Sequence, residues 1–249
     1  MTAARGPWSF DETRQLVGAR YGEPQAELLS PCLDSLRARQ FYAAYHLANF
    51  ERLVVDRLMA APEGWTPARL VLPATEEEAK QNQILRSRLA AEATACAASL
   101  HSLMDTLAYA VALSLGMNLG VDALTERRIS LGAVVKRLSV SGAEPALAAA
   151  LATVHQSSDV TYLEDLVNHS KHRSVIRPGF CFDATSDLTS FSIEFESFNF
   201  KREKHAPLNA YVRREVKSAL VKADDAIARW IVEVGHRLLD ELAKDVSTA

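Results

Sequence analysis

Apolar side chains recur at steps of three and four along most of this chain, the spacing that gathers them on one face of an α-helix. The pattern predicts three long helices, over Glu23–Ala60, from Thr75 to about Met117 and from Pro207 to about Asp245. Thr75 is a good helix start, because its hydroxyl precedes three glutamates that suit the positive end of the helix dipole. Shorter helices are predicted over residues 8–21, 125–138, 144–155 and 157–173. The chain is therefore expected to be mostly α-helical.

The period changes to two after Ser174, which indicates a β-hairpin just before the last helix. Apolar residues alternate with polar ones at Phe191, Ile193 and Phe195. We place the hairpin over Val175–Lys201, with its turn at Asp183–Thr189 and a β-bulge at Glu196–Ser197, where the alternation slips. Its apolar face is expected to pack on the helices, because an isolated hairpin is only marginally stable.

Together these elements predict an antiparallel helical bundle with very long helices and one β-hairpin over about 175–201. We treat residues 1–249 as a single domain, in which residues 1–22 form a leading helix or arm. The composition agrees, since 48% of the residues are hydrophobic and only 10 are glycine, which leaves ample material for a helical core.

Cysteine usage and hydropathy point to the cytoplasm. Cys32, Cys96 and Cys181 are an odd number, widely spaced and set among apolar residues, as reduced core cysteines are. The first ten residues lack the apolar segment of a signal peptide. The longest apolar stretch, Leu107–Val121, is shorter than the roughly 20 residues that a membrane span needs. We therefore expect a cytoplasmic protein that does not enter a membrane.

The sequence lacks the motifs of several common enzyme classes. It contains no P-loop, no Gly-x-Gly-x-x-Gly, no Cys-x-x-Cys, no His-Glu-x-x-His and no Gly-x-Ser-x-Gly. P-loop NTPases, dinucleotide enzymes, zincins and α/β-hydrolases are disfavoured, and no cofactor is expected. A metal site would need His101, Asp105, His169 and His172 to converge. Nothing in the sequence brings these four together, so no metal is expected either.

The segment from Asn168 to Arg173 concentrates two imidazoles, an ammonium, a guanidinium and an amide within six residues at a predicted helix end. Helical spacing places Glu164, Asn168 and His172 on one face, and Asp165, His169 and Arg173 on the next. We expect the first face to border the core and the second to be solvent-exposed, with modest i,i+4 pairing. The first face has two interpretations. It is a buried network that joins helix to hairpin, or a phosphate site whose histidine exchanges a proton.

Charge is unevenly distributed around this segment. The whole chain has a net charge of −3, yet Lys171–Lys217 holds nine Lys and Arg against six Asp and Glu. A solvated rim and a surface that contacts phosphate both explain this local excess.

The pattern Asn168-x-x-Lys171-His172-Arg173 at a helix end resembles the HEPN superfamily (higher eukaryote and prokaryote nucleotide-binding domains), in particular a poorly characterised bacterial branch. His101-Ser102-x-x-Asp105 also resembles that branch, so the likeness spans roughly Glu76–Glu241. The resemblance implies a homodimeric helical bundle that acts on RNA. Many such proteins are metal-independent RNases of toxin–antitoxin or phage-defence systems, with a site completed across the two copies.

In this interpretation His172 is the acid and base, Arg173 and Lys171 stabilise phosphate, and Asn168 orients them. The resemblance gives the remaining candidates a positioning role, in which they contact the catalytic groups and not the substrate. These candidates are His101, Asp105, Glu164 and His169. Val167 stands where the family has an arginine, and Arg173 is the residue that could replace it. Two alternatives remain open. The chain is a non-catalytic HEPN-like binding or scaffold module, whose partner would be an antitoxin-like protein, or its polar cluster merely ties hairpin to bundle.

Overall fold

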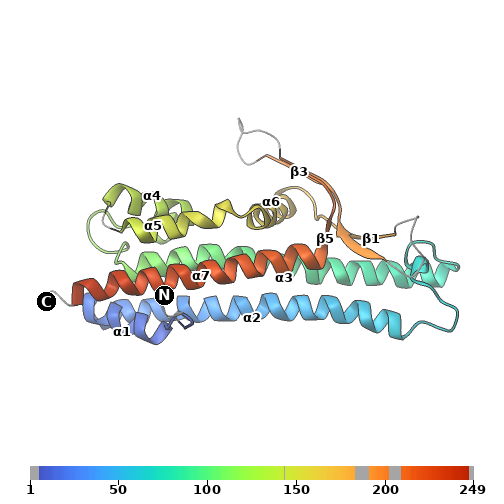
Figure 1. Ribbon diagram of the computed structural model, residues 1–249, viewed down its shortest axis with the longest axis horizontal. Helices are drawn as coiled ribbons and strands as arrows, with labels where there is room; N and C mark the ends of the chain where they lie inside the picture. Colours follow the sequence, from blue (N-terminus) through green and yellow to red (C-terminus); the bar gives the residue numbers. More distant parts are fainter. Residues whose placement is uncertain (1–5, 143, 183–190, 202–208, 247–249) are drawn as a thin grey trace, which may run out of the picture. The chain divides into compact units, whose positions relative to one another are not determined.

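The computed structural model describes residues 6–142, 144–182, 191–201 and 209–246 (Figure 1). Its α-helices are α1 Phe10–Tyr21, α2 Glu23–Met59, α3 Glu76–Ser114, α4 Leu131–Ser141, α5 Pro145–Ala152, α6 Ser158–His172 and α7 Val216–Val246. Short 3-10 helices lie at η1 Pro67–Leu70, η2 Glu126–Arg128 and η3 Thr153–Gln156. The predicted class, mostly helical with several very long helices, is confirmed.

The predicted hairpin before the last helix is confirmed as well. Strand β1 (Pro178–Cys181) pairs antiparallel with β2 (Ser192–Phe195), and Gly179 lies opposite Glu194. The predicted turn at 183–189 lies outside the described residues. Ile193 and Phe195 are buried while Ser192 and Glu194 are half-exposed, so one face of β2 is turned to the core, as the alternation predicts.

Two details of the strand prediction are wrong. The slip at Glu196–Ser197 is not a bulge, because there the chain leaves β2 and enters β3 (Phe198–Phe200), which pairs with β4 (Asn209–Tyr211) in a separate sheet. We call this antiparallel pair the β3–β4 ribbon.

The last helix was expected from Pro207, but β4 and then β5 (Arg214–Glu215) precede α7, and β5 pairs with β2. Pro207 itself lies outside the described residues. Val212, which lies within the predicted bounds of that helix, is exposed. Its spacing to Val216 fits a helix, yet the pairing of β5 with β2 decides the local structure.

The chain divides into two compact units. Unit 1 comprises Met1–Gln40, Ser102–Val160 and Asp225–Ala249, and unit 2 comprises Phe41–His101 and Thr161–Asp224. The long helices α2, α3 and α7 contribute to both units, since the boundaries fall inside them. The functional candidates are concentrated in unit 2.

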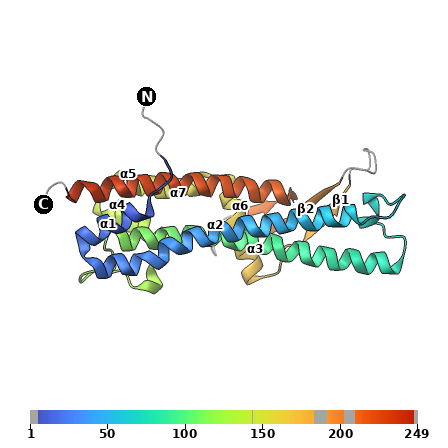
Figure 2. The same cartoon turned by 90° about the horizontal axis from the view of Figure 1, so that it is seen from below.

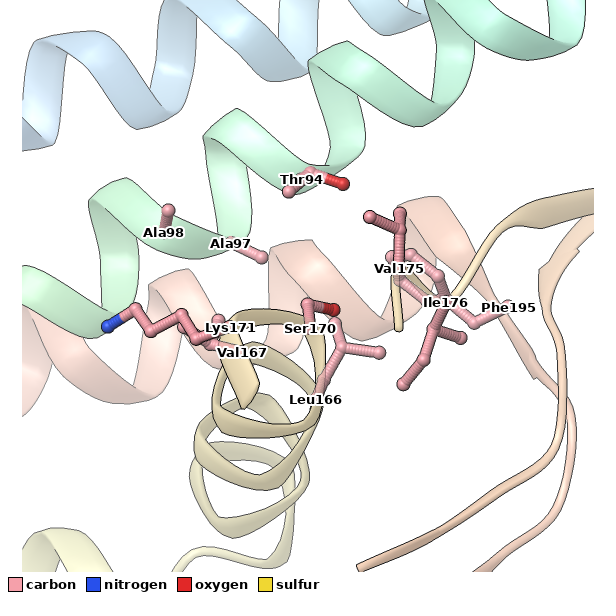
Figure 3. Close-up of a pocket in the computed structure, with 10 residues that line it drawn as sticks. All are labelled: Thr94, Ala97, Ala98, Leu166, Val167, Ser170, Lys171, Val175, Ile176 and Phe195. Atoms are coloured by element: carbon pink, nitrogen blue, oxygen red, sulfur yellow. The ribbon is translucent and has the colours of Figure 1, made fainter. Parts of the chain in front are cut away.

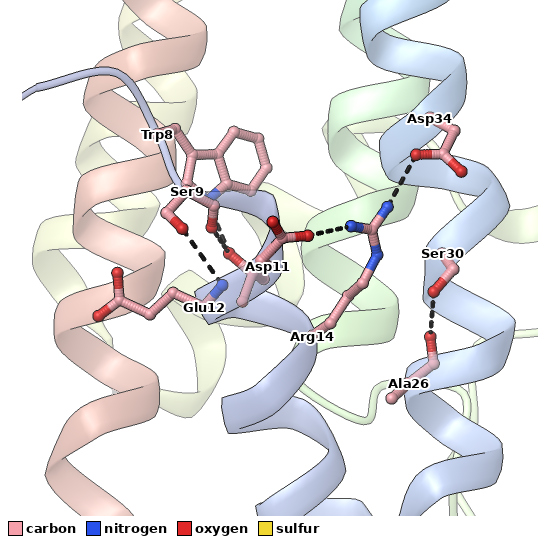
Figure 4. Close-up of polar contacts among 9 residues, drawn as sticks. Trp8, Ser9, Asp11, Glu12, Arg14, Ala26, Ser30 and Asp34 are labelled. Carbon is pink, nitrogen blue, oxygen red and sulfur yellow. Dashed lines mark hydrogen bonds and ion pairs between the residues drawn. The ribbon is translucent and has the colours of Figure 1, made fainter.

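Unit 1 gathers α1, α4, α5 and the adjoining parts of the long helices around an apolar core (Figure 2). Ser9 caps α1 by accepting the Glu12 amide at 3.2 Å. Arg14 joins α1 to α2, since its guanidinium lies 2.8 Å from Asp11 and 2.7 Å from Asp34 (Figure 4). These local signals explain why the leading segment forms a helix docked on its own unit.

Trp8 is the aromatic anchor of unit 1. Its side chain is 8% exposed, and its indole Nε1 donates to the Thr13 hydroxyl at 2.8 Å. Gly235 on α7 leaves room for the ring, because a Cβ built on that glycine overlaps the Cγ and Cδ2 atoms of Trp8. The close approach of α7 to Trp8 therefore depends on glycine.

Gly235→Ala is expected to destabilise the chain by about 2 kcal/mol, because the added methyl must displace a well-packed indole. Urea unfolding followed by tryptophan fluorescence measures the change. Gly18→Ala in α1 is the matched control, since its new Cβ would meet neighbours at an ordinary 3.5 Å and alanine favours a helix. Equal midpoints for wild type and Gly235→Ala would contradict the packing argument.

Unit 2 pairs the second part of α2 with the first part of α3, which run side by side in opposite directions (Figures 1 and 2). Thr75 caps α3 as predicted, accepting the Glu78 amide at 3.2 Å. The connection between the helices is fastened to α3 by Asn82 and Arg86, whose side chains donate to the Arg69 and Leu70 carbonyls at 2.6 and 2.8 Å. Helix α6 and both sheets complete the unit.

Helix α3 has one further property. Within the described residues it is the one helix long and apolar enough to cross a membrane, and 61% of its most apolar stretch is buried inside the protein. Core helices of soluble proteins pass the same test when they are mostly buried.

Candidate functional site

Helix α6 presents the predicted polar cluster at its last turn. Its apolar residues Leu163, Leu166 and Val167 are buried, as expected of the face toward the core. The helix ends where the Arg173 and Ser174 amides both donate to the His169 carbonyl, at 2.9 and 3.3 Å. The cluster from 168 to 173 thus occupies the C-terminal end of a helix, where cations are favoured by the helix dipole.

Asp165 departs most from its predicted environment. It was expected on a solvent-exposed face, but it is completely buried. Its Oδ2 accepts hydrogen bonds from the Tyr211 hydroxyl at 2.5 Å and from the Asn209 amide at 3.1 Å, both on β4. The prediction failed because the β3–β4 ribbon covers this side of the helix.

His169 and Arg173 continue the same stripe onto the ribbon. The His169 Nδ1 lies 3.1 Å from the Ser174 carbonyl, to which it must donate, and its ring centre is 5.5 Å from that of Phe198. Arg173 donates from Nη1 to the Asn199 carbonyl at 3.3 Å, and its guanidinium lies 5.6 Å from the Phe200 ring centre. The stripe of Asp165, His169 and Arg173 therefore joins α6 to the ribbon.

The other stripe was expected to border the core, and it does so at only one end. Glu164 is buried, Asn168 is half-buried and His172 is exposed. Across the part of the chain that the structure describes, the side chains of Asn168 and His172 make no hydrogen bond or ion pair. The polar network that was predicted to join this stripe to the hairpin is formed instead by the stripe of Asp165, His169 and Arg173, and it joins α6 to the β3–β4 ribbon.

His101 and Asp105, four residues apart on α3, do not pair with each other. Asp105 is exposed, and among the described residues its carboxylate has no hydrogen bond or ion pair. His101 is half-buried in unit 2, whereas Asp105 belongs to unit 1. Only His101 therefore shares a unit with the cluster. Within the described ranges no three His, Cys, Asp or Glu side chains lie close enough together to hold a metal ion.

Sequence reasoning missed an aromatic cluster beneath the ribbon. Tyr162, on α6, is buried, and its ring centre lies 5.6 Å from that of Phe198 and 5.3 Å from that of Tyr211. The Arg214 guanidinium lies 4.4 Å from the centre of the Tyr162 ring. Burial raises the Tyr162 pKa from 10.0 to about 12, although Arg214 acts in the opposite direction. One signal for this cluster was present in the sequence. Tyr162 and Asp165 are three residues apart, a spacing that puts their side chains on adjoining faces of a helix.

A cavity of about 130 Å³ opens beside the cluster (Figure 3). It is lined by Thr94, Ala97 and Ala98 of α3, by Leu166, Val167, Ser170 and Lys171 of α6, and by Val175, Ile176 and Phe195. Val167, at the position of the family's arginine, thus faces an apolar space. The small side chains of Ala97 and Ala98 on α3 leave this space open.

The exposed end of α6 carries uncompensated positive charge. Lys171, His172, Arg173 and Arg177 are exposed, whereas the nearest acidic residues of the helix, Glu164 and Asp165, are buried. Among the described residues Lys171 has no ion pair. This arrangement can attract an anion and offers an imidazole for proton transfer beside it.

No family model, no curated protein and no solved structure matches the chain. The geometry and chemistry of the end of α6 are therefore the observations from which a function is inferred.

Proposed function

We propose that the chain is a cytoplasmic, HEPN-like protein that engages phosphates of RNA, or of a nucleotide, at the end of α6. One observation carries this proposal. Lys171 and His172 are adjacent and exposed, and neither side chain has a partner among the described residues. Unpaired ammonium and imidazole groups on one exposed helical turn suit a phosphate, which binds through charge and hydrogen bonds.

Arg173 adds a second kind of contact. It uses Nη1 for the Asn199 carbonyl, but the residue is exposed and a guanidinium has five N–H donors in total. The ribbon thus orients Arg173 while leaving donors for a phosphate oxygen. HEPN proteins have an arginine at the position of Val167, whose buried side chain carries no charge. We assign the phosphate contact of that arginine to Arg173.

The same groups supply what metal-free RNA cleavage requires. His172 would take the proton from a ribose 2′-hydroxyl, whose oxygen then bonds to phosphorus while the bond from phosphorus to the 5′-oxygen breaks. The products are a 2′,3′-cyclic phosphate and a 5′-hydroxyl, to which the protonated His172 returns the proton it took. Lys171 and Arg173 would stabilise the charge that develops on phosphorus, with Asn168 orienting them. The resemblance implies that a second copy of the chain completes the site. It also implies an antitoxin-like protein as a partner.

A second candidate is a binding or scaffold module without catalysis. The attachment of Asp165, His169 and Arg173 to the ribbon favours it, because that stripe has an evident structural role. The two candidates share the phosphate contact of Lys171 and His172 and differ in whether RNA is cut.

Lys171→Gln and His172→Ala are each expected to weaken binding of a fluorescently labelled single-stranded RNA pool about tenfold, through loss of a charged or polar phosphate contact. Fluorescence anisotropy at several salt concentrations measures this. Lys80→Gln, at an exposed position of α3, is the matched control with the same charge change and should bind like wild type. Wild-type affinity in both α6 variants, or no binding by the wild type, would overturn the proposed function.

In EDTA the wild type is expected to cleave the RNA pool, and His172→Ala should lose at least about a hundredfold in rate, the scale of acid–base catalysis. Gel analysis should show 2′,3′-cyclic phosphate ends. Thermal melts should coincide, since His172 is exposed and has no partner in the described residues. RNA that binds through Lys171 and His172 but stays intact would select the non-catalytic module.

A further inference from the structure

The cavity beside Lys171 has the features of a small-ligand pocket. Its volume is about 130 Å³, and its walls are mostly alanine, leucine, valine and phenylalanine. An apolar protein cavity of about 150 Å³ can hold a benzene ring, so this space is of the size that one planar ring system needs. Ligand pockets are typically apolar, with a few polar groups that fix orientation.

Two hydroxyls supply such polar groups. Thr94 on α3 and Ser170 on α6 both line the cavity, and Figure 3 shows them on facing elements. Among the described residues neither hydroxyl makes a side-chain hydrogen bond. A hydroxyl can donate or accept, and the edge of a nucleobase carries both kinds of group.

Lys171 connects the cavity with the proposed phosphate contact. It lines the cavity, is exposed, and has no ion pair within the described ranges. A single ligand could therefore insert a planar base between α3 and α6 and place its phosphate against the ammonium.

The cavity also continues into a wider groove of about 950 Å³, with which it shares Thr94, Ala98 and Val175. Arg86 and Arg177 lie along this groove, and Glu196 is its one acidic lining residue. The groove gives the ribose and a neighbouring nucleotide a positively charged path out of the cavity.

We infer that this cavity is a nucleobase pocket, which holds one base of the RNA or nucleotide whose phosphate Lys171 contacts. The inference rests on the proposed function and names the part of the ligand that gives the site its selectivity. A protein that bound only the RNA backbone would gain nothing from this cavity.

The test compares ligands with and without a base. Uridine 5′-monophosphate and adenosine 5′-monophosphate are titrated against ribose 5-phosphate, using calorimetry and NMR shifts of the full chain. At least one nucleotide is expected to bind about tenfold or more tightly than ribose 5-phosphate, because the base adds apolar burial. Ala98→Phe fills the cavity, so this variant should bind that nucleotide no more tightly than it binds ribose 5-phosphate.

Ala79→Phe is the matched control. Ala79 is exposed near the start of α3 and lines neither the cavity nor the groove, so its variant should keep the preference for the nucleotide. Should Ala98→Phe fail to fold, the combined variant Thr94→Val and Ser170→Ala tests the same pocket with little change in volume. The combined variant should bind the nucleotide several-fold more weakly than wild type and should bind ribose 5-phosphate with unchanged affinity.

The outcomes separate the two proposals. If RNA and ribose 5-phosphate bind and Lys171→Gln weakens both, but the base adds no affinity, the nucleobase pocket is refuted and the phosphate site stands. The pocket is likewise refuted if a folded Ala98→Phe, or the hydroxyl variant in its place, keeps the full preference for the nucleotide. If neither RNA nor ribose 5-phosphate binds the wild type, the proposed function fails and the inference fails with it.

Discussion

Raising the pH from 9 to 11 is expected to remove about 6 kcal/mol of folding stability, a large part of what a typical domain has. Burial raises the pKa of Cys32 and of Cys96 from 9.0 to about 12 each, and that of Tyr162 from 10.0 to about 12. Each pKa unit corresponds to about 1.36 kcal/mol. The three residues are at most 9% exposed, and they belong to both units.

The sign follows from which state holds the proton. Above pH 9 the unfolded chain releases thiol protons, and above pH 10 the tyrosine proton, whereas the folded chain retains them until about pH 12. Stability is therefore unaffected below about pH 8 and falls steadily from pH 9 upward. The exposed pairs Lys217–Glu51 and Lys244–Glu241 act in the same direction, because loss of the lysine charge removes the pairing.

Urea titrations at pH 8, 9, 10 and 11 under reducing conditions, followed by far-UV circular dichroism, measure this dependence. The double variant Cys32→Ala and Cys96→Ala should flatten the curve between pH 9 and 10. Tyr162→Phe should flatten only the part above pH 10. It should also keep or raise stability at pH 7, because the buried tyrosine hydroxyl has no hydrogen-bond partner among the described residues. A wild-type stability that is level from pH 9 to 11 would refute the argument.

The helices could be predicted because their signals are local. The Thr75 hydroxyl accepts a backbone amide of the first turn of α3, as predicted, and α6 ends within one residue of its expected position. Apolar spacing in long segments is equally local. Each of these features can be read from neighbouring residues alone.

The strands after the hairpin could not be predicted from such signals. Val212 and Val216 have helical spacing, yet the segment before α7 pairs with β2, some twenty residues earlier in the chain. The slip at Glu196–Ser197 was visible, but whether it marks a bulge or a change of sheet depends on the distant β4 strand. Pairing between separated segments decides both cases.

The helix end that carries the candidate residues was predicted, but the burial of its two stripes was not. Helical spacing gave the two stripes of α6 correctly, but a stripe holding Asp165 and Arg173 is normally solvent-exposed. For Asp165 the ribbon reverses this expectation by supplying hydroxyl and amide donors, whereas Arg173 stays exposed and donates to a ribbon carbonyl. The cavity escaped prediction for a related reason, since it depends on the gap between two helices and not on either sequence segment.

The contacts with the ribbon divide the 168–173 cluster into two parts with different roles. His169 and Arg173 have partners in the helix end and the ribbon, so their loss should disturb the structure. Lys171 and His172 have no partner in the described residues, so their loss should disturb binding and leave the fold intact. Function and stability can therefore be tested on adjacent residues of one helical turn.

Asp165→Ala is expected to destabilise the chain by about 3 kcal/mol, because it removes the acceptor of two buried or half-buried donors. The ribbon should also loosen, which hydrogen–deuterium exchange of the amides of Phe198–Phe200 and Asn209–Tyr211 would report. Asp105→Ala is the matched control. Its carboxylate is exposed and has no partner in the described residues, so the change should stay within about 0.5 kcal/mol.

A double-mutant cycle assigns the effect to the contact itself. Tyr211→Phe removes only the donor hydroxyl, and its coupling with Asp165→Ala should be about 1 kcal/mol or more, because the two groups share one hydrogen bond. If the two changes add without coupling, the ribbon is held by its aromatic packing on Tyr162 and not by Asp165. Since the ribbon orients Arg173, Asp165→Ala should also lower RNA affinity, and Arg173→Ala made in that background should then add little.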